Sequence, residues 1–414
     1  MKKTVLRFFA LVLCLLLVLP AVSSCDQNGT VYTLGAYTIK SDEYSYLLGM
    51  FKKQLMVSFE CTSESDLSYE VREGVTLGEY WEAVYRPGFE QSVLRLLFAQ
   101  ALFDDYGLSI NEEAKKNSDE VLNTLIKYYG GFNEKYFNTY LNTNGYGYSA
   151  DTIRRVYEMQ LKESAVMEYL YGLDNSKVTP EQKESYYKDN YMHFQVLVIN
   201  TLYKKHEDSQ GNVTYINLSE NEVAYQKLLA KELTELLVSK NLDYDYKIID
   251  KTLSYEELWE KYSDDKEFPQ GWYMLEPTAT QMATSDTLAT ALVLREGDCG
   301  VVDAKRYFDG DGTIKTENGD EEIKEGDYFA YGSAFIKKLT LDDGAYAREE
   351  NKDFFDEKTF LSNTAEDAFI KKLNQYETEN DITVWYSDLK NSFTLDGVKA
   401  NELDYYAFYG QKEN

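Results

Sequence analysis

The sequence predicts an α+β protein in which a mostly helical body is interrupted by a domain of antiparallel strands and helices. Apolar residues recur at helical spacing over most of residues 41–172. The pattern changes to that of a buried strand at 194–199, and residues 299–341 stay rich in strand-forming residues. Helical spacing returns at 364–379. The order helices, strands, helices therefore favours an inserted domain.

The helical body begins after a short extended segment, residues 26–40, in which Gly35 separates two strand-like runs as in a hairpin. Ser41 is predicted as the N-cap of the first helix. The apolar residues of that helix recur at helical spacing: Tyr44, Leu47, Leu48 and Phe51. Further helices are predicted in four ranges: 78–105, 111–128, 133–142 and 149–172.

The interrupting domain opens with a helix that Thr179 caps and that carries Pro180 in its first turn. A strand follows at 194–199. Two further helices are predicted at 219–237 and 255–262. Residues 299–341 are predicted to be rich in strands, with an acidic turn at 309–312. After the last helix, a strand-like pair is expected around 382–385 and 393–395.

The first 24 residues read as an export signal. Lys2, Lys3 and Arg7 precede an unbroken apolar run, and a small-residue site ending in Cys25 follows. An apolar core of about 12 residues is too short for a membrane span of roughly 20 residues. Val-Ser-Ser-Cys resembles the bacterial lipobox, which implies an acylated Cys25 and a lipid-anchored, extracytoplasmic protein. An ordinary cleaved signal with an incidental cysteine is the alternative.

The charge of the chain excludes one class of partner. With 43 Lys and Arg against 71 Asp and Glu, the formal net charge is −28. Such a surface repels phosphate backbones, so no nucleic-acid partner is expected. Apart from Cys25, the exported part contains Cys61 and Cys299, which fall in different predicted domains, so a disulfide between them is not favoured.

Short motifs in the interrupting domain resemble those of the SurA/PrsA-type foldases, in which a parvulin-like prolyl isomerase domain interrupts a helical chaperone domain. Residues 255–265, Tyr-Glu-Glu-Leu-Trp-Glu-Lys-Tyr-Ser-Asp-Asp, are similar to the family's F-x-x-L-A-x-x-Y-S-D-D. Residues 270–273 are similar to its Gly-rich turn, 288–297 to its A-F-x-L-x-x-G helix and turn, and 331–339 to its closing G-Y-H-I-I-K-L strand. The motifs occur in the family's order.

The resemblance implies a domain organisation. Residues 1–24 would be the signal, and 25–178 a helical SurA/PrsA-like chaperone domain. Residues 179–341 would form a divergent parvulin-like domain, and 342–414 a helix and strand that pack back on the first domain.

The resemblance also implies a site. Asp265 stands where the family carries Cys or Asp, and Gln195 and Ala334 align with its two central histidines. Asp265 and Gln195 are the candidate catalytic residues. The candidate substrate-binding residues are Leu288, Trp272 and Phe335. The chain has only His193 and His206, and a two-residue shift in register would bring His193 to the first position.

Other chemistry finds little support. Asp309-Gly310-Asp311-Gly312 hints at calcium, but it lacks the glycine and glutamate of an EF-hand loop, so an acidic hairpin tip is favoured and no metal or cofactor is expected. Asp264 and Asp265 could be an acid–base pair, although capping in a turn is favoured. Motifs of serine, zinc and P-loop hydrolases are absent from the sequence.

Three functions follow as alternatives. The first is a membrane-tethered foldase or chaperone that binds unfolded exported polypeptides, with a parvulin-like domain that has lost activity. The second is an active prolyl isomerase, which lowers the barrier of about 18–20 kcal/mol to peptide-bond rotation. The third is a solute-binding lipoprotein, which requires two lobes built on parallel sheets.

Overall fold

The computed structural model describes residues 29–72, 74–207, 213–266, 269–277, 281–282, 285–307, 312–316, 319–324, 328–380 and 383–403. Cys25 and the predicted export signal lie outside these residues, as does most of the predicted acidic turn at 309–312. The chain divides into two compact units. Unit 1 combines the residues up to Val178 with those from Ala365 onward, and unit 2 is Thr179–Thr364. The described elements confirm the predicted α+β class.

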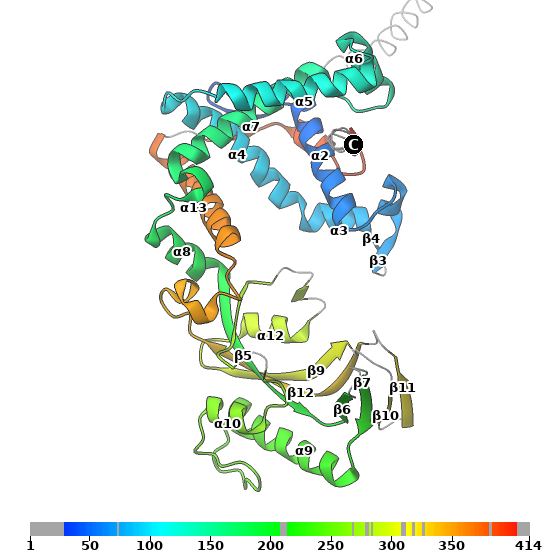
Figure 1. Ribbon diagram of the computed structural model, residues 1–414, viewed down its shortest axis with the longest axis vertical. Coiled ribbons are helices and arrows are strands. Elements are labelled where there is room, and N and C mark those ends of the chain that lie inside the picture. Colours follow the sequence, from blue (N-terminus) through cyan, green and yellow to red (C-terminus); the bar gives the residue numbers. More distant parts are fainter. Residues whose placement is uncertain are drawn as a thin grey trace, which may run out of the picture. The chain divides into compact units, whose positions relative to one another are not determined.

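Unit 1 begins with the predicted hairpin and continues as helices (Figure 1). Strands β1 (Thr30–Leu34) and β2 (Tyr37–Lys40) pair antiparallel around Gly35, whose φ of 59° suits glycine. The helices are α2 (Ser41–Ser58), α3 (Leu77–Val84), α4 (Arg86–Asp105), α5 (Glu112–Gly130), α6 (Glu134–Thr143) and α7 (Ala150–Tyr171). The short elements are η1 (Glu64–Ser68), β3 (Glu70–Arg72), β4 (Val75–Thr76) and η2 (Leu173–Asn175).

The elements after unit 2's sheet differ in detail from the prediction. Helix α13 (Glu357–Asn380) begins earlier than expected and continues from unit 2 into unit 1. Strand β13 (Trp385–Tyr386) pairs with β1, whereas 393–395 is not a strand, and η6 (Asp388–Ser392) lies between them. The expected pairing of 382–385 with 393–395 is therefore wrong, because β1 already offers an open edge to β13.

The first residues of α2 and α8 show how local sequence sets where a helix begins. Helix α2 starts at Ser41 itself, and its Glu43 carboxylate accepts a hydrogen bond from the Lys40 amide at 2.7 Å. Ser41 is thus the first helical residue and not the predicted cap. Thr179 does cap α8 (Pro180–Asn190), because its hydroxyl accepts from the Gln182 amide at 3.3 Å.

Unit 2 is built on a four-stranded antiparallel sheet in the order β8-β5-β12-β9. These strands are β8 (Trp272–Leu275), β5 (Tyr191–Asn200), β12 (Tyr328–Leu339) and β9 (Cys299–Tyr307). Val198 lies opposite Ala334, and Val196 opposite Ile336, so the first and last strands of the domain are direct neighbours. The parallel lobes of a solute-binding protein are not found in the described residues.

Helices cover both faces of this sheet. Figure 1 shows α9 (Glu220–Leu233) and α10 (Tyr255–Tyr262) on one side and α12 (Asp286–Val293) on the other. Helix α9 ends in a π-helical turn, η3 (Thr234–Val238). Two hairpins extend the domain as a second sheet in the order β11-β10-β7-β6. Its strands are β6 (Tyr203–Glu207), β7 (Val213–Asn217), β10 (Gly312–Thr316) and β11 (Gly319–Ile323).

The segment after β12 packs within unit 2. Two short turns, η4 (Ala345–Ala347) and η5 (Glu349–Asn351), precede α13. An aromatic cluster joins this segment to α8 and the sheet: Tyr186, Tyr187, Tyr191, Tyr273, Ala345, Phe355 and Phe360. Residues 342–364 therefore share a core with the sheet, beyond the boundary at 341 that the motifs suggest.

Candidate functional site

The side chains of β5 and β12 alternate between the two faces of the sheet, and this alternation decides where each predicted site residue lies. On one face, Leu197, Ile199 and Phe335 pack against α9 and α10. On the other face, Phe194 and Ala334 belong to the cluster that contains Ala291 of α12. A residue one position along a strand therefore points to the opposite layer.

Gln195 and Ala334, the two positions that align with the family's central histidines, are separated by this alternation. Gln195 lies opposite Lys337, in register with the face that carries Leu197. Its side chain is 3% exposed, and its amide nitrogen donates to the Pro269 carbonyl at 2.6 Å. Ala334 is in the cluster on the other face. The structure does not bring these two positions together.

His193 is held by backbone groups. Its Nδ1 lies 2.9 Å from the Thr340 carbonyl oxygen and its Nε2 lies 3.0 Å from that of Gln270. The ring stacks on Tyr273 with centroids 3.8 Å apart. His193 and Gln195 together fix the turn that enters β8. Neither of them approaches Asp265 through a described contact.

The three predicted substrate-binding residues fall on different faces. Trp272 and Leu288 are partly buried and pack against the cluster on the α12 face. Phe335 is fully buried in the cluster on the α9 face. A side chain without exposed surface offers nothing to a ligand, so Phe335 serves the core in this structure.

Asp265 lines a pocket of about 840 Å³ at the end of the sheet that faces β6. The Ser263 hydroxyl positions it by donating to the Asp265 carbonyl at 2.8 Å while accepting from the Val198 amide. The other lining residues are mainly polar and aromatic: Asn200, Tyr203, Lys204, Gln226, Asp264, Lys266, Lys305, Arg306, Tyr307 and Tyr331, with Val198 and Leu218. Burial raises the pKa of Tyr203, and the nearby Arg306 guanidinium opposes that shift.

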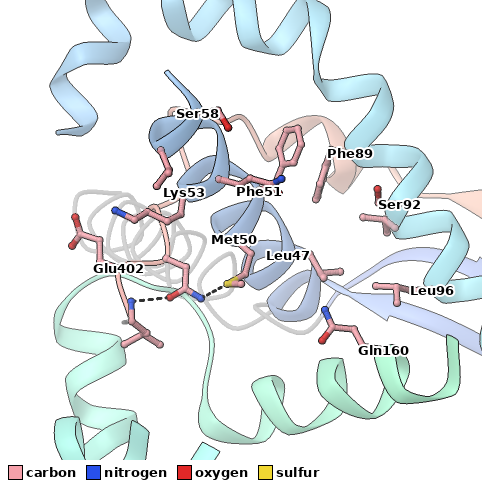
Figure 2. Close-up of a pocket in the computed structure, with 15 residues that line it drawn as sticks. Leu47, Met50, Phe51, Lys53, Ser58, Phe89, Ser92, Leu96, Gln160 and Glu402 are labelled. Atoms are coloured by element: carbon pink, nitrogen blue, oxygen red, sulfur yellow. Dashed lines mark hydrogen bonds between the residues drawn. The ribbon is translucent and has the colours of Figure 1, made fainter. Parts of the chain in front are cut away.

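A second pocket lies wholly within unit 1 and has a different chemistry. Its volume is about 760 Å³, and helix α2 forms one wall. Helix α2 contributes Leu47, Met50, Phe51, Lys53, Gln54, Val57 and Ser58; α4 contributes Phe89, Ser92, Val93 and Leu96; Gln160 of α7 and Asn401, Glu402 and Leu403 complete it. We call this cavity the α2 pocket. Figure 2 shows Leu47 and Phe51 on the side of α2 that faces Phe89 and Leu96.

The apolar side chains of the α2 pocket remain open to solvent in part. Met50 is 38% exposed and Val57 is 65% exposed. They follow one another on α2 at a spacing of seven residues, which puts them on the same face. The sequence predicted the helix and its apolar stripe at Leu47 and Phe51. It did not show that the stripe continues past the core, because that depends on where neighbouring helices stop.

A buried lysine joins helix α2 to the residues that precede Asn401. Lys52 has no exposed surface, and its ammonium donates to Glu64 at 2.6 Å and to the Val398 carbonyl at 2.9 Å. Glu64 also accepts from the Ala400 amide at 2.9 Å. Burial alone would raise the pKa of Glu64, but these hydrogen bonds and the Lys52 charge lower it below its ordinary value.

Residues 394–403, which we call the return segment, lie directly on α2. The Asn401 amide donates to the Gly49 carbonyl at 2.9 Å, and a Cβ at Gly49 would stand 2.7 Å from the Lys399 oxygen. Only glycine allows the two backbones to approach this closely. Asn401 then donates to the Met50 sulfur and accepts from the Leu403 amide, as the dashed lines in Figure 2 show. The return segment thereby becomes a wall of the α2 pocket.

Two further properties were sought among the described residues. No helix in the described ranges is long and apolar enough to cross a membrane. No cluster of His, Cys, Asp or Glu in those ranges is arranged to hold a metal ion. Cys61 and Cys299 are both unpaired and lie in different units.

Comparison with known proteins gives similarity at the level of structure. No protein-family model and no curated protein matches the chain. PrsA from Bacillus subtilis is 19% identical, with 80% of this chain and 99% of that chain covered and a TM-score of 0.18. The foldase protein PrsA from Streptococcus pneumoniae is 16% identical, with 79% of this chain and 99% of that chain covered and a TM-score of 0.19. The foldase protein PrsA from Lactococcus lactis is 12% identical, with 86% of this chain and 94% of that chain covered and a TM-score of 0.19. Each of the three alignments covers most of this chain.

Proposed function

We propose that this protein is a membrane-tethered extracytoplasmic foldase of the chaperone type, which binds unfolded exported polypeptides in the α2 pocket. The observation that carries the proposal is the partly exposed apolar stripe of α2, with Met50 and Val57 open to solvent beside a cavity of about 760 Å³. Exposed apolar side chains that border a cavity offer a surface on which an apolar partner can bury its own side chains.

The chemistry of the pocket suits loosely selected clients. Its walls are mainly aliphatic and aromatic, and Met50 has a flexible thioether that adapts to side chains of different shape. Burying one apolar client side chain contributes about 1.5–3 kcal/mol. Two or three such contacts, less the cost of ordering the client, correspond to affinities between about millimolar and micromolar. Such affinities allow binding and release during folding.

The proposal includes a parvulin-like domain without isomerase activity. Gln195 and Ala334 stand where the family motif has histidines, and neither side chain titrates near neutral pH. Gln195 is moreover committed to the Pro269 carbonyl. An active isomerase is a second candidate, because Asp265 lies in a pocket of about 840 Å³ with Tyr331. That candidate requires a chemistry that does not use the histidine pair.

The client-binding proposal is tested with a charge placed in the α2 pocket. We expect Val57→Glu to weaken binding of a fluorescently labelled, reduced and alkylated protein at least about fivefold, because a client would have to desolvate the new carboxylate. The matched control is Leu173→Glu, which changes an equally exposed apolar residue of unit 1 outside the pocket. Equal binding by both variants and the unchanged protein would contradict the proposal, and so would no binding at all.

The isomerase question has its own test. We expect the full exported chain to leave the cis–trans exchange time of a proline-containing peptide at its uncatalysed value of tens to hundreds of seconds. A clear acceleration that Asp265→Ala abolishes would establish the second candidate. An acceleration that survives Asp265→Ala would contradict both the inactive domain and the role predicted for Asp265.

The tether depends on Cys25. We expect a Cys25→Ser variant, expressed in a bacterium that processes lipoproteins, to move from the membrane fraction to the soluble exported fraction. Incorporation of labelled fatty acid into the unchanged protein and not into the variant is the matching readout. A variant that stays with the membrane would contradict anchoring through this residue.

A further inference from the structure

The described part of the return segment ends at the α2 pocket, directly before an aromatic stretch of the sequence. Leu403 is the last described residue and lines the pocket. The sequence continues as Asp-Tyr-Tyr-Ala-Phe-Tyr-Gly at 404–410, which lies outside the described residues. Four of these residues are aromatic, and none between 405 and 411 is charged. An uncharged aromatic stretch is unusual in a chain with a formal net charge of −28 and matches the apolar walls of the pocket.

The residues that precede this stretch are held at the pocket by hydrogen bonds. The Asn401 amide is bonded to Gly49 of α2, and the Leu403 amide to the Asn401 side chain. An extended residue spans about 3.3–3.6 Å, so residues 405–408 can reach about 7–18 Å from Leu403. Leu47 and Val57 are ten residues apart on α2, which corresponds to about 15 Å along the helix axis. The stretch is therefore long enough to follow the whole apolar stripe.

We propose that residues 404–410 are an intramolecular ligand of the α2 pocket and compete there with clients. The aromatic side chains pack on the stripe that includes Met50, Phe51 and Val57, where sulfur–aromatic and ring–ring contacts suit them. The inference rests on the proposed function, because it assigns the segment and the client to one site. In this proposal, residues 404–410 occupy the α2 pocket when no client is present.

The strength of this competition follows from linkage through the chain. A short tether gives an effective concentration in the millimolar range. If the free segment bound with a dissociation constant of about 1 mM and the effective concentration were about 5–10 mM, the pocket would be filled about nine-tenths of the time. The apparent affinity for a client would then fall about fivefold to tenfold. Clients that bind weakly would be excluded, whereas long apolar segments would displace the ligand.

The test uses the full exported chain with the aromatic residues of the segment replaced by serine: Tyr405→Ser, Tyr406→Ser, Phe408→Ser and Tyr409→Ser. We expect this variant to bind the labelled unfolded protein about fivefold to tenfold more tightly than the unchanged chain. We also expect a synthetic peptide of residues 404–414 to bind the variant, and to bind it less after addition of Val57→Glu. Addition of Leu173→Glu is the matched control and should leave peptide binding unchanged.

The outcomes separate this inference from the proposed function. Equal client affinity of the serine variant and the unchanged chain overturns the inference, and the proposed function still stands if Val57→Glu weakens both. Peptide binding that is sensitive to Val57→Glu, in a protein that binds no unfolded chain, supports the pocket as the segment's site and overturns the client role. Peptide binding that ignores Val57→Glu overturns the assignment to the α2 pocket.

Discussion

Glu90 shows how one residue joins several elements of unit 1. Its carboxylate accepts from the hydroxyls of Tyr32 on β1 and Tyr44 on α2, and from Arg86 Nε at 2.7 Å. Lys390 of η6 lies 3.6 Å away. Burial alone would raise the pKa of Glu90, but the hydrogen bonds from the two tyrosines and Arg86 lower it below its ordinary value. The charged form of Glu90 is therefore favoured by folding.

This lowered pKa predicts an acid dependence of stability. A carboxyl whose pKa is lower in the folded state stabilises the fold above its unfolded pKa, and that contribution is lost as pH falls through the folded value. We expect Glu90→Gln to lower the free energy of unfolding at pH 7 by about 1.5–3 kcal/mol, which is typical for a lost charged hydrogen bond. The difference from the unchanged protein should begin to shrink near the ordinary pKa of a glutamate, about 4.3, and should vanish only below the lower pKa of folded Glu90, where both proteins carry a neutral side chain.

Denaturant titrations at several pH values measure this difference. Glu120→Gln is the control, because Glu120 is mostly exposed and its ion pair with Lys116 spans 3.8 Å. A Glu90→Gln deficit that stays constant from pH 7 to pH 3 would contradict the assignment of the effect to ionised Glu90.

At the scale of elements, Glu232 fixes a long loop to helix α9. Its side chain is fully buried, and its two oxygens accept from the amides of Lys247, Ile248 and Ile249 at 2.6–2.9 Å. The loop that follows η3 has no strand or helix of its own before α10. One carboxylate therefore supplies the acceptors that a regular ladder would provide.

Removal of this carboxylate should release the loop. We expect Glu232→Ala to destabilise unit 2 by about 3 kcal/mol or more, because it leaves three amides without an acceptor and creates a cavity. Glu232→Gln keeps one oxygen acceptor and should lose less. Hydrogen exchange at Ile248 and Ile249 is the direct readout. Unchanged protection of both amides in Glu232→Ala would contradict this role.

The sequence predicted the helices and strands better than their pairing. The Thr179 cap and the hairpin at Gly35 follow from local chemistry, and the structure has both. The partner of β13 and the placing of Gln195 opposite Lys337 depend on strand register. A shift of one residue moves a side chain to the other face of a sheet, and motif alignment does not fix that shift. For the same reason the sequence could not show that Gln195 and Ala334 lie on different faces.

At the scale of the whole molecule, the two units have separate cores. Unit 2 is continuous in sequence, and its first strand, β5, pairs with its last long strand, β12, in the centre of the four-stranded sheet. Gly332 of β12 lies opposite Asn200 of β5, and a Cβ at Gly332 would stand 1.9 Å from the Ile199 carbonyl oxygen. Backbone atoms cannot move aside at this contact as a flexible side chain can.

A substitution at Gly332 therefore tests the independence of the units. We expect Gly332→Ala to destabilise unit 2 by about 3 kcal/mol or more, while binding of unfolded protein in the α2 pocket of unit 1 stays within about twofold. Gly88→Ala is the control, because no atom lies within 4 Å of its Cβ position and alanine favours helix at this exposed position of α4. Loss of client binding in Gly332→Ala at a temperature where unit 2 is unfolded would show that the units depend on one another.

The contact of Lys52 with the Val398 carbonyl joins residues 346 positions apart. Strand β1 likewise pairs with β13, and the Gly49 carbonyl accepts from the Asn401 amide, so both contacts need residues from the end of the chain. During synthesis, residues 29–178 emerge before unit 2 but lack these partners until nearly the whole polypeptide has appeared. Unit 2, inserted between them, has all its strands earlier. The order of emergence thus favours completion of the inserted domain before the first-made helices are closed, which reverses the usual rule that the N-terminal domain is finished first.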